Sequence, residues 1–173
     1  MLARALSADR EVAYGAAFAL ALAGHTWEAQ AIADDIEQRF PEATCVRCCY
    51  LPTLRAQLAL NRAEATKALS LLETVVPYEL GVHESTTRAL FGALYATYVR
   101  GEVYLALHRD HEATIEFQKI LDRSGIVLSD PVGIVARLQL ARAFARSGNQ
   151  VRRGPYTKTY WSSGRTPTRE FQF

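Results

Sequence analysis

The sequence lacks the features that mark membrane and secreted proteins. No apolar run approaches the ~20 residues that a membrane-spanning helix needs. The run Ala16–Ala23 is short and follows Arg10 and Glu11, so it predicts a buried helix. No separate apolar segment with a cleavage site follows Met1, and we therefore expect no signal peptide. These absences lead us to expect a cytoplasmic protein with no membrane partner.

Cysteine, glycine and proline are also scarce. The three cysteines, Cys45, Cys48 and Cys49, are odd in number and lie within about one helical turn. Without a secretory signal, this argues against a disulfide framework. No second cluster of ligands accompanies them, so we predict no metal site. With 10 Gly, 6 Pro and 49% apolar residues in 173, most of the chain should be ordered around one core.

No set of catalytic motifs is present. His108-Arg109-Asp110 matches the start of the kinase catalytic loop, but position 115, where that loop needs Asn, is Ile115. A glycine-rich phosphate loop, a nucleophile elbow and a zinc-protease motif are missing as well. We interpret the string as a polar turn between two helices. The sequence therefore predicts no catalytic residue, no cofactor and no enzyme activity.

Charge is unevenly distributed along the chain. The net charge is +2, but residues 150–173 contain five basic residues and one acidic residue. The remaining 149 residues hold 15 basic and 17 acidic side chains. Because the longer part is mildly acidic, a basic surface for nucleic acid is not indicated.

What the sequence does contain is a helical repeat, clearest in Thr97–Leu121. Small and aromatic residues stand there at offsets 0, 3, 12, 16 and 19, namely Gly101, Tyr104, Ala113, Phe117 and Ile120. That spacing is typical of the helix-turn-helix tetratricopeptide (TPR) unit. We expect Gly101 to let the second helix approach the first, and Tyr104 and Phe117 to fill the seam between them.

The same offsets recur earlier and, in part, later. The matching residues are Ala17, Leu20, Ala29, Ala33 and Ile36 in the first repeat, Ala56, Ala59, Ala68, Leu72 and Val75 in the second, and Ala141 and Phe144 in the fourth. Helices are predicted over 9–23, 26–40 and 132–146, with further pairs inside 44–76 and 97–121. Ser7 is the expected N-cap of the first helix, and Asp130-Pro131 the expected start of the last. Pro52 should lie near the start of its helix, where a missing N–H is tolerated.

These patterns predict an all-α fold, a right-handed α-solenoid of tetratricopeptide-like repeats whose last repeat is incomplete. Residues 1–149 should form the repeat domain, with three full repeats and the first helix of a fourth. Residues 150–173 have no helical apolar period and read as an irregular or disordered basic tail.

A solenoid of this kind binds partners along the groove lined by the first helix of each repeat. Offsets from the anchor residues place ten candidates there: Tyr14, Phe18, Tyr50, Thr53, Gln57, Tyr95, Tyr98, Glu102, Arg142 and Arg146. Aromatic residues with a few polar groups suit a protein segment or peptide. The alternative is that these residues pack against each other or against a neighbouring domain. Tyr104, in contrast, is expected in the core.

Longer motifs add a family resemblance that covers about residues 9–149. YLPTLRAQLAL (50–60), PYELG (77–81), YVRGEVYLAL (98–107) and EFQKILDRSGIVLSDPVG (116–133) resemble the C-terminal repeat region of bacterial, acidobacterial-type serine/threonine protein kinases. The resemblance implies a protein-interaction scaffold that follows a kinase domain in a larger signalling protein. Similar repeats follow winged-helix transcriptional regulators, so a sensing or oligomerisation arm of such a regulator is the alternative.

The tail departs from that family. Its last repeat continues with a helix that reads roughly YQDFLxLWKDADPDIPI, whereas codons for residues 156–173, read two bases later, can spell YKDLLVLWKDADPGIPI. We therefore hypothesise that residues from about 150 onward result from a frameshift, genuine or a sequencing error. Without the second helix of repeat four, Leu140, Ala141 and Phe144 should lose part of their cover. We expect a frayed end at 132–149 and self-association through it.

Overall fold

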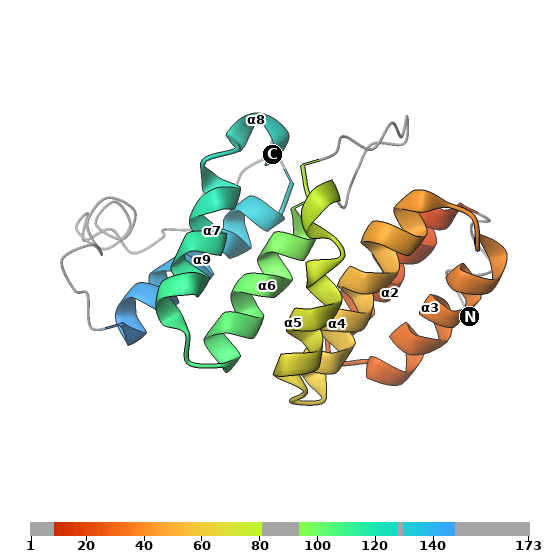
Figure 1. Ribbon diagram of the computed structural model, residues 1–173, viewed down its shortest axis with the longest axis horizontal. Helices are drawn as coiled ribbons and strands as arrows, with labels where there is room; N and C mark the ends of the chain where they lie inside the picture. Colours follow the sequence, from red (N-terminus) through yellow and green to blue (C-terminus); the bar gives the residue numbers. More distant parts are fainter. Residues whose placement is uncertain (1–8, 81–93, 128–129, 148–173) are drawn as a thin grey trace, which may run out of the picture.

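The computed structural model describes residues 9–80, 94–127 and 130–147, and all regular secondary structure in these ranges is helical (Figure 1). The predicted all-α class is therefore confirmed. The elements in order are α2 (Arg10–Leu22), α3 (Thr26–Arg39), η1 (Val46–Tyr50), α4 (Leu51–Asn61), α5 (Ala65–Glu73), η2 (Val76–Tyr78), α6 (Tyr95–Ala106), α7 (Asp110–Leu121), α8 (Ser124–Val127) and α9 (Val132–Arg146).

Consecutive helices pack in pairs. Contacts are extensive within the pairs α2–α3, α4–α5 and α6–α7, and α9 packs against α7 to a similar extent. Neighbouring pairs are joined through α2 with α4 and through α4 with α6, while α6 also contacts α9. Figure 1 shows the pairs side by side, with α3 toward one end of the molecule and α9 toward the other.

Short turns with left-handed backbone separate the paired helices. Gly24 has φ +85° between α2 and α3, a backbone conformation that favours glycine. Ala63 and His108 adopt φ of 61° and 57° in the two corresponding turns. His108 thus lies in a turn between α6 and α7, which is where the sequence placed the string His108-Arg109-Asp110.

Capping agrees with the sequence at one end and differs at the other. The Asp130 carboxylate accepts a hydrogen bond of 2.9 Å from the Val132 N–H, so Asp130 caps α9 as predicted. At the first helix the cap is Asp9, whose carboxylate accepts the Glu11 N–H at 2.9 Å. The predicted cap, Ser7, lies outside the described residues.

The closest approach of two helices occurs within the α6–α7 pair. A Cβ atom built on Gly101 would lie 2.5 Å from the Phe117 ring, so only glycine fits there without a shift. Ala113, Phe117 and Ile120 are fully buried, in agreement with the repeat spacing. Tyr104 differs from its predicted place in the core, because it is only partly buried and the Arg109 guanidinium lies 4.7 Å from its ring centroid.

Pro52 lies near the start of α4, as predicted, because α4 begins at Leu51. Helical backbone nevertheless precedes it, since it begins at Thr44 and Val46–Tyr50 form a π-helical turn directly before α4. The Leu51 N–H bonds the Val46 carbonyl across this wider turn, and Pro52 itself has no N–H to donate.

The predicted basic tail at 150–173, its frameshift hypothesis and the missing second helix of repeat four concern residues outside the described ranges. The last described helix, α9, is present with the predicted bounds, Val132–Arg146.

Candidate functional site

The ten predicted groove residues, called the inner row below, are distributed over five elements, α2, η1, α4, α6 and α9. Tyr14 in α2 stacks on Tyr50 in η1, with ring centroids 4.3 Å apart and an interplanar angle of 8°. Phe18 in α2 meets Tyr95 in α6 edge-on at 5.1 Å. Rings from α2 and α6 therefore touch across α4, which contributes the smaller Thr53 and the polar Gln57 to this row.

Mutual contact buries most of the inner row. Phe18 is fully buried and Tyr14, Tyr95 and Tyr98 are 3 to 6% exposed. Burial raises the pKa of Tyr14 and of Tyr95 above the ordinary tyrosine value, so both rings stay neutral. The sequence predicted Tyr95 and Tyr98 on an open lining and Tyr104 in the core. The structure buries Tyr95 and Tyr98, and Tyr104 is half-buried against the core. The second predicted alternative was that these residues pack against each other. It describes the inner-row residues of α2, η1 and α4 and the two tyrosines of α6.

Toward α9 the inner row becomes polar. The Tyr98 hydroxyl donates to Glu102 at 2.7 Å, and the Gln139 amide donates to the same carboxylate at 2.6 Å. Burial raises the pKa of Glu102, although both hydrogen bonds and the Arg142 charge oppose that shift. Arg142 and Arg146 are exposed on α9. The Arg146 guanidinium is engaged, since it donates to the Leu105 carbonyl at 2.9 Å and pairs with Asp110 at 3.1 Å.

Sequence reasoning missed the part of the inner row that remains open. Val135 and Leu138 stand six and three residues before the anchor Ala141, the offsets that Tyr95 and Tyr98 have from Gly101. They are 36% and 52% exposed, and the adjacent Ile134 is 70% exposed. The same offset rule could have found them, because it requires only the sequence. Of the three residues predicted to lose part of their cover, Leu140 is buried, whereas Ala141 and Phe144 are only partly buried.

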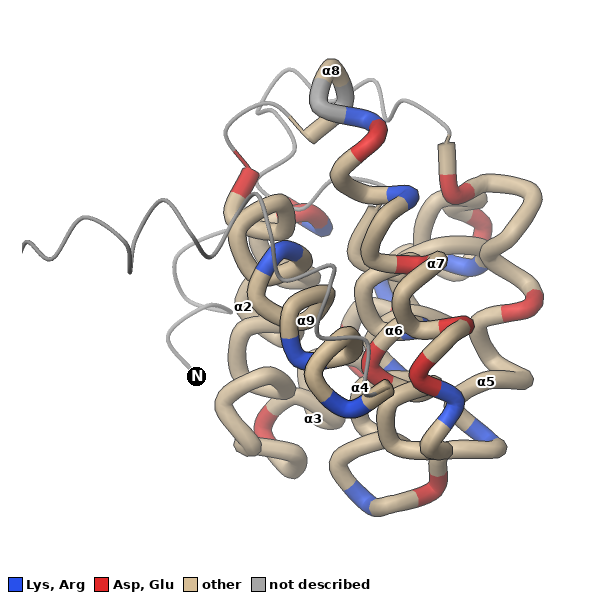
Figure 2. The backbone as a smooth tube through the Cα atoms, turned by 90° about the vertical axis from the view of Figure 1, so that its left-hand side faces the viewer, with Lys and Arg blue, Asp and Glu red and all other residues tan. Residues whose placement is uncertain are grey.

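Charge on α9 has a single sign. Val132–Arg146 contains Arg137, Arg142 and Arg146 and neither Asp nor Glu. Figure 2, which turns this end of the molecule toward the viewer, shows the basic positions spaced along α9 between uncharged ones. The exposed face of α9 is therefore apolar with a basic border.

A buried ionic cluster supports α6 from the side away from the inner row. The Arg100 guanidinium donates to Glu116 on α7 at 2.7 and 3.0 Å and also to Glu79, which follows η2. Lys119 reaches the other Glu116 oxygen at 2.7 Å. Burial alone would lower the pKa of Arg100, but its hydrogen bonds to Glu116 and Glu79 raise it. We interpret this cluster as structural, because it joins three elements with every charge opposed by another.

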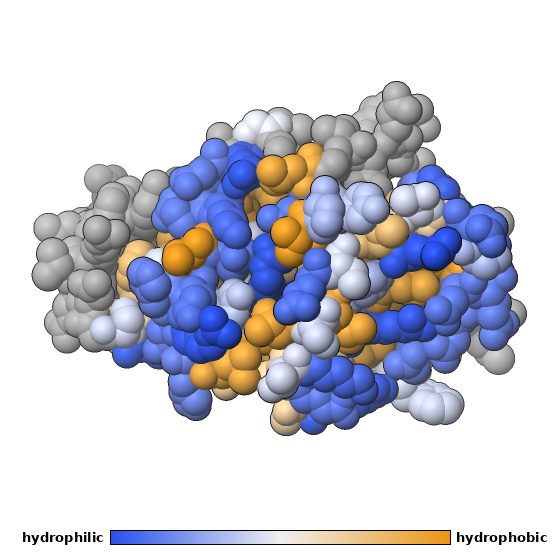
Figure 3. All heavy atoms as spheres, in the orientation of Figure 1, coloured by the Kyte–Doolittle hydropathy of each residue, from blue (hydrophilic) through white to orange (hydrophobic). Residues whose placement is uncertain are grey.

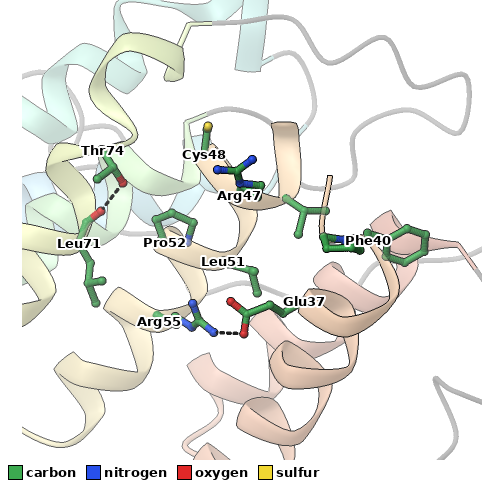
Figure 4. A pocket seen from close by; sticks show the side chains of 11 residues that line it. Glu37, Phe40, Arg47, Cys48, Leu51, Pro52, Arg55, Leu71 and Thr74 are labelled. Atoms are coloured by element: carbon green, nitrogen blue, oxygen red, sulfur yellow. Dashed lines mark hydrogen bonds and ion pairs between the residues drawn. The ribbon is translucent and has the colours of Figure 1, made fainter. Parts of the chain in front are cut away.

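A second candidate site is a pocket of about 580 Å³ between α3, η1, α4 and α5, called the outer pocket below (Figure 4). Its walls combine apolar side chains with two arginines and one thiol. The lining residues are Glu37, Phe40, Pro41, Val46, Arg47, Cys48, Leu51, Pro52, Arg55, Leu71 and Thr74. None of them was singled out from the sequence as a ligand contact, because they meet only when three helices pack.

Of the three cysteines, Cys48 is among the residues that line this pocket. Within the described residues, no group of three or more His, Cys, Asp and Glu side chains is placed to hold a metal ion. All three thiols are free and half-buried. Burial and the neighbouring thiols raise the pKa of Cys49 to about 11, so at neutral pH it is an unreactive thiol.

Neither the surface nor the comparisons with known proteins narrow the range of possible functions much further. On the face that Figure 3 shows, apolar residues gather near the middle of the molecule, with hydrophilic residues over α7 and α3. Among helices in the described ranges, none has the length and apolar composition of a bilayer-spanning segment. No protein-family model matches the sequence, and no curated protein or solved structure is significantly similar to it.

Proposed function

We propose that this chain is a non-catalytic protein–protein interaction scaffold, a right-handed α-solenoid of tetratricopeptide-like repeats in the cytoplasm. Three features support the proposal. Helices pair in chain order, the anchor residues of the three full repeats (Ala17, Ala56 and Gly101) are small and buried, and Gly101 lies against Phe117 as the repeat spacing requires. Repeat units of this kind present surfaces for binding rather than chemistry.

The observation that carries the proposal is the exposed apolar face of α9. Ile134, Val135 and Leu138 extend the inner row beyond its buried part and lie close together on one helix, and grouped exposed apolar residues of this kind mark interaction sites. The basic border of Arg137 and Arg142 favours a protein segment that carries apolar and acidic side chains. Binding at this face would continue the packing that already joins α2, α4 and α6.

Site-specific photo-crosslinking in cells that express the gene tests this proposal. A benzophenone amino acid at position 138 should capture a defined partner, and the additional substitution Ile134→Glu should abolish capture. The matched control places the same amino acid at Gln118, which is exposed on α7. If both positions capture the same proteins in equal yield, α9 is no specific interface and the proposal fails.

Self-association through the same end is a second candidate, favoured by the same exposed residues. Sedimentation velocity over a range of concentrations should show reversible growth beyond the monomer. Leu138→Glu should suppress that growth, because it places a charge on the contact face. A wild-type protein that stays monomeric at all concentrations rules out this candidate while leaving the partner proposal intact.

The parent protein is a separate part of the proposal. We propose that the module belongs to a larger signalling protein such as a bacterial serine/threonine kinase, and the alternative is a winged-helix transcriptional regulator. The DNA upstream of the Met1 codon distinguishes them, since it should encode kinase motifs in the first case and a winged helix in the second. The downstream DNA tests the frameshift hypothesis in the same way.

A further inference from the structure

The outer pocket has the size and wall chemistry of a small-molecule site. Its volume of about 580 Å³ falls within the ~300–1,000 Å³ range of ligand pockets. The apolar wall comes from Leu51 and Pro52 on α4 and from Leu71 on α5, while Phe40 at the end of α3 lies at the edge with its ring turned away from them (Figure 4). An apolar group placed here would contact atoms from both α4 and α5.

The two arginines of the pocket are in different electrostatic states. Arg55 is paired, because its guanidinium lies 2.6 Å from the Glu37 carboxylate. Arg47 is exposed, and within the described residues no carboxylate lies at ion-pair distance from it. Figure 4 shows Arg47 on one side of Leu51 and Pro52 and the Arg55–Glu37 pair on the other. The pocket thus offers one uncompensated cation beside an apolar surface.

The backbone places Arg47 and Cys48 at the pocket for a specific reason. Both lie in the π-helical turn Val46–Tyr50, and Pro52 follows directly in α4. A π turn is wider than an α turn and is frequent at functional sites. Here the π turn lies just before Pro52, which has no N–H to donate to a regular helix. The unusual turn is therefore linked to the proline in the local sequence.

We propose that the outer pocket binds a small amphipathic carboxylate. Its apolar body would lie against Leu51, Pro52 and Leu71, and its carboxylate would pair with Arg47. Guanidinium–carboxylate pairing is strong and directional, so the acid group should contribute selectivity as well as affinity. This site is separate from the α9 face, and the inference does not depend on the proposed scaffold function.

The test uses 4-phenylbutyrate as the probe and its neutral amide, 4-phenylbutanamide, as the matched control. Binding to the full chain is followed by ¹H–¹⁵N chemical shifts and by isothermal titration calorimetry. For a probe of this size a Kd on the order of 1 mM is expected. The carboxylate should bind at least about fivefold more tightly than the amide, and the shifts should map to Arg47, Leu51, Arg55 and Leu71.

Two variants distinguish the pocket from non-specific binding. Arg47→Glu should weaken carboxylate binding at least about fivefold, while Arg137→Glu, the same charge change on exposed α9, should leave it unchanged. Thr74→Trp fills the pocket from an exposed rim position and should abolish binding of both probes. Circular dichroism verifies that each variant is folded.

Several results would overturn the inference. Equal affinities for the acid and the amide would show that Arg47 does not pair with the carboxylate. Unchanged carboxylate binding to Arg47→Glu would show the same. Shifts confined to Ile134, Val135 and Leu138 would show that the probe merely covers an exposed apolar face. Absence of binding at probe concentrations of about 10 mM would exclude the site, since it exceeds the expected Kd about tenfold.

Discussion

Equivalent positions in α6 and α9 have opposite environments. Tyr95 and Tyr98 in α6 are 5% and 6% exposed, whereas Val135 and Leu138, at the same offsets in α9, are 36% and 52% exposed. Side-chain hydrophobicity does not account for the difference, because valine and leucine are the more apolar residues. Helix α6 contacts α4 and α5 on one side and α7 and α9 on the other. The strongest contact of α9 is with α7, and α9 meets α6 less extensively.

The comparison teaches that register and burial are separate properties of a repeat. The register of a helix determines which residues share a face. Whether that face is buried depends on helices that come before and after it in the array. In this protein the same row of positions is therefore core in α2, α4 and α6 and surface in α9, and only the surface part can bind a partner without unfolding.

The largest predicted effect contrasts these two parts of the inner row directly. Phe18→Ala should destabilise the fold by about 3–5 kcal/mol, because it leaves a cavity between Tyr14 and Tyr95. Leu138→Ala should change stability by no more than about 0.5 kcal/mol. Urea denaturation of both variants measures the difference. Similar costs at the two positions would mean that α9 is covered as fully as α2.

A smaller effect is expected where α6 and α7 approach most closely. Gly101→Ala should cost about 1–3 kcal/mol, because the added methyl overlaps the Phe117 ring. Gly125→Ala in α8 meets no atom within 4 Å and should be neutral or stabilise by up to about 1 kcal/mol. Thermal melts compare the two variants. Partial recovery in Gly101→Ala combined with Phe117→Leu would show that the ring contact is the cause.

The polar link between the first two pairs should matter less again. The Asn61 amide donates to the Ala21 carbonyl at 2.7 Å and accepts from the Gln57 amide at 3.0 Å. Asn61→Ala should cost about 1–2 kcal/mol, since the buried Gln57 amide loses its acceptor and the Ala21 carbonyl keeps only backbone donors such as the Gly24 N–H. Gln118→Ala, which removes only an exposed contact with Asp122, is the control. Equal urea midpoints for the two variants would contradict a structural role for Asn61.

The smallest effect concerns Glu102, which lies where the buried and open parts meet. Burial raises its pKa in the folded state, so the folded protein binds more protons than the unfolded chain between the two pKa values. Stability should therefore fall as pH rises from the ordinary glutamate pKa through the raised one. Glu102→Gln should flatten that part of the profile, as measured by urea denaturation between pH 4 and 8. A variant with the wild-type slope would exclude Glu102 as the titrating group.

Local sequence determined the helices and turns of this protein. Gly24 fits a left-handed turn, Asp130 caps α9, and the spacing of Gly101 and Phe117 produces a close helix pair. Each of these depends on one or two turns of backbone or on a short-range pattern, and a single sequence contains that information. The order of helices along the chain was predictable for the same reason.

Tertiary structure alone decided which surfaces are open. Sequence offsets placed Tyr95 and Tyr98 on an inner face, but only the contact of α2 with α6 shows that this face is closed. The outer pocket likewise requires α3, α4 and α5 together. Burial depends on neighbours distant in the chain, and periodicity within one helix contains no information about them.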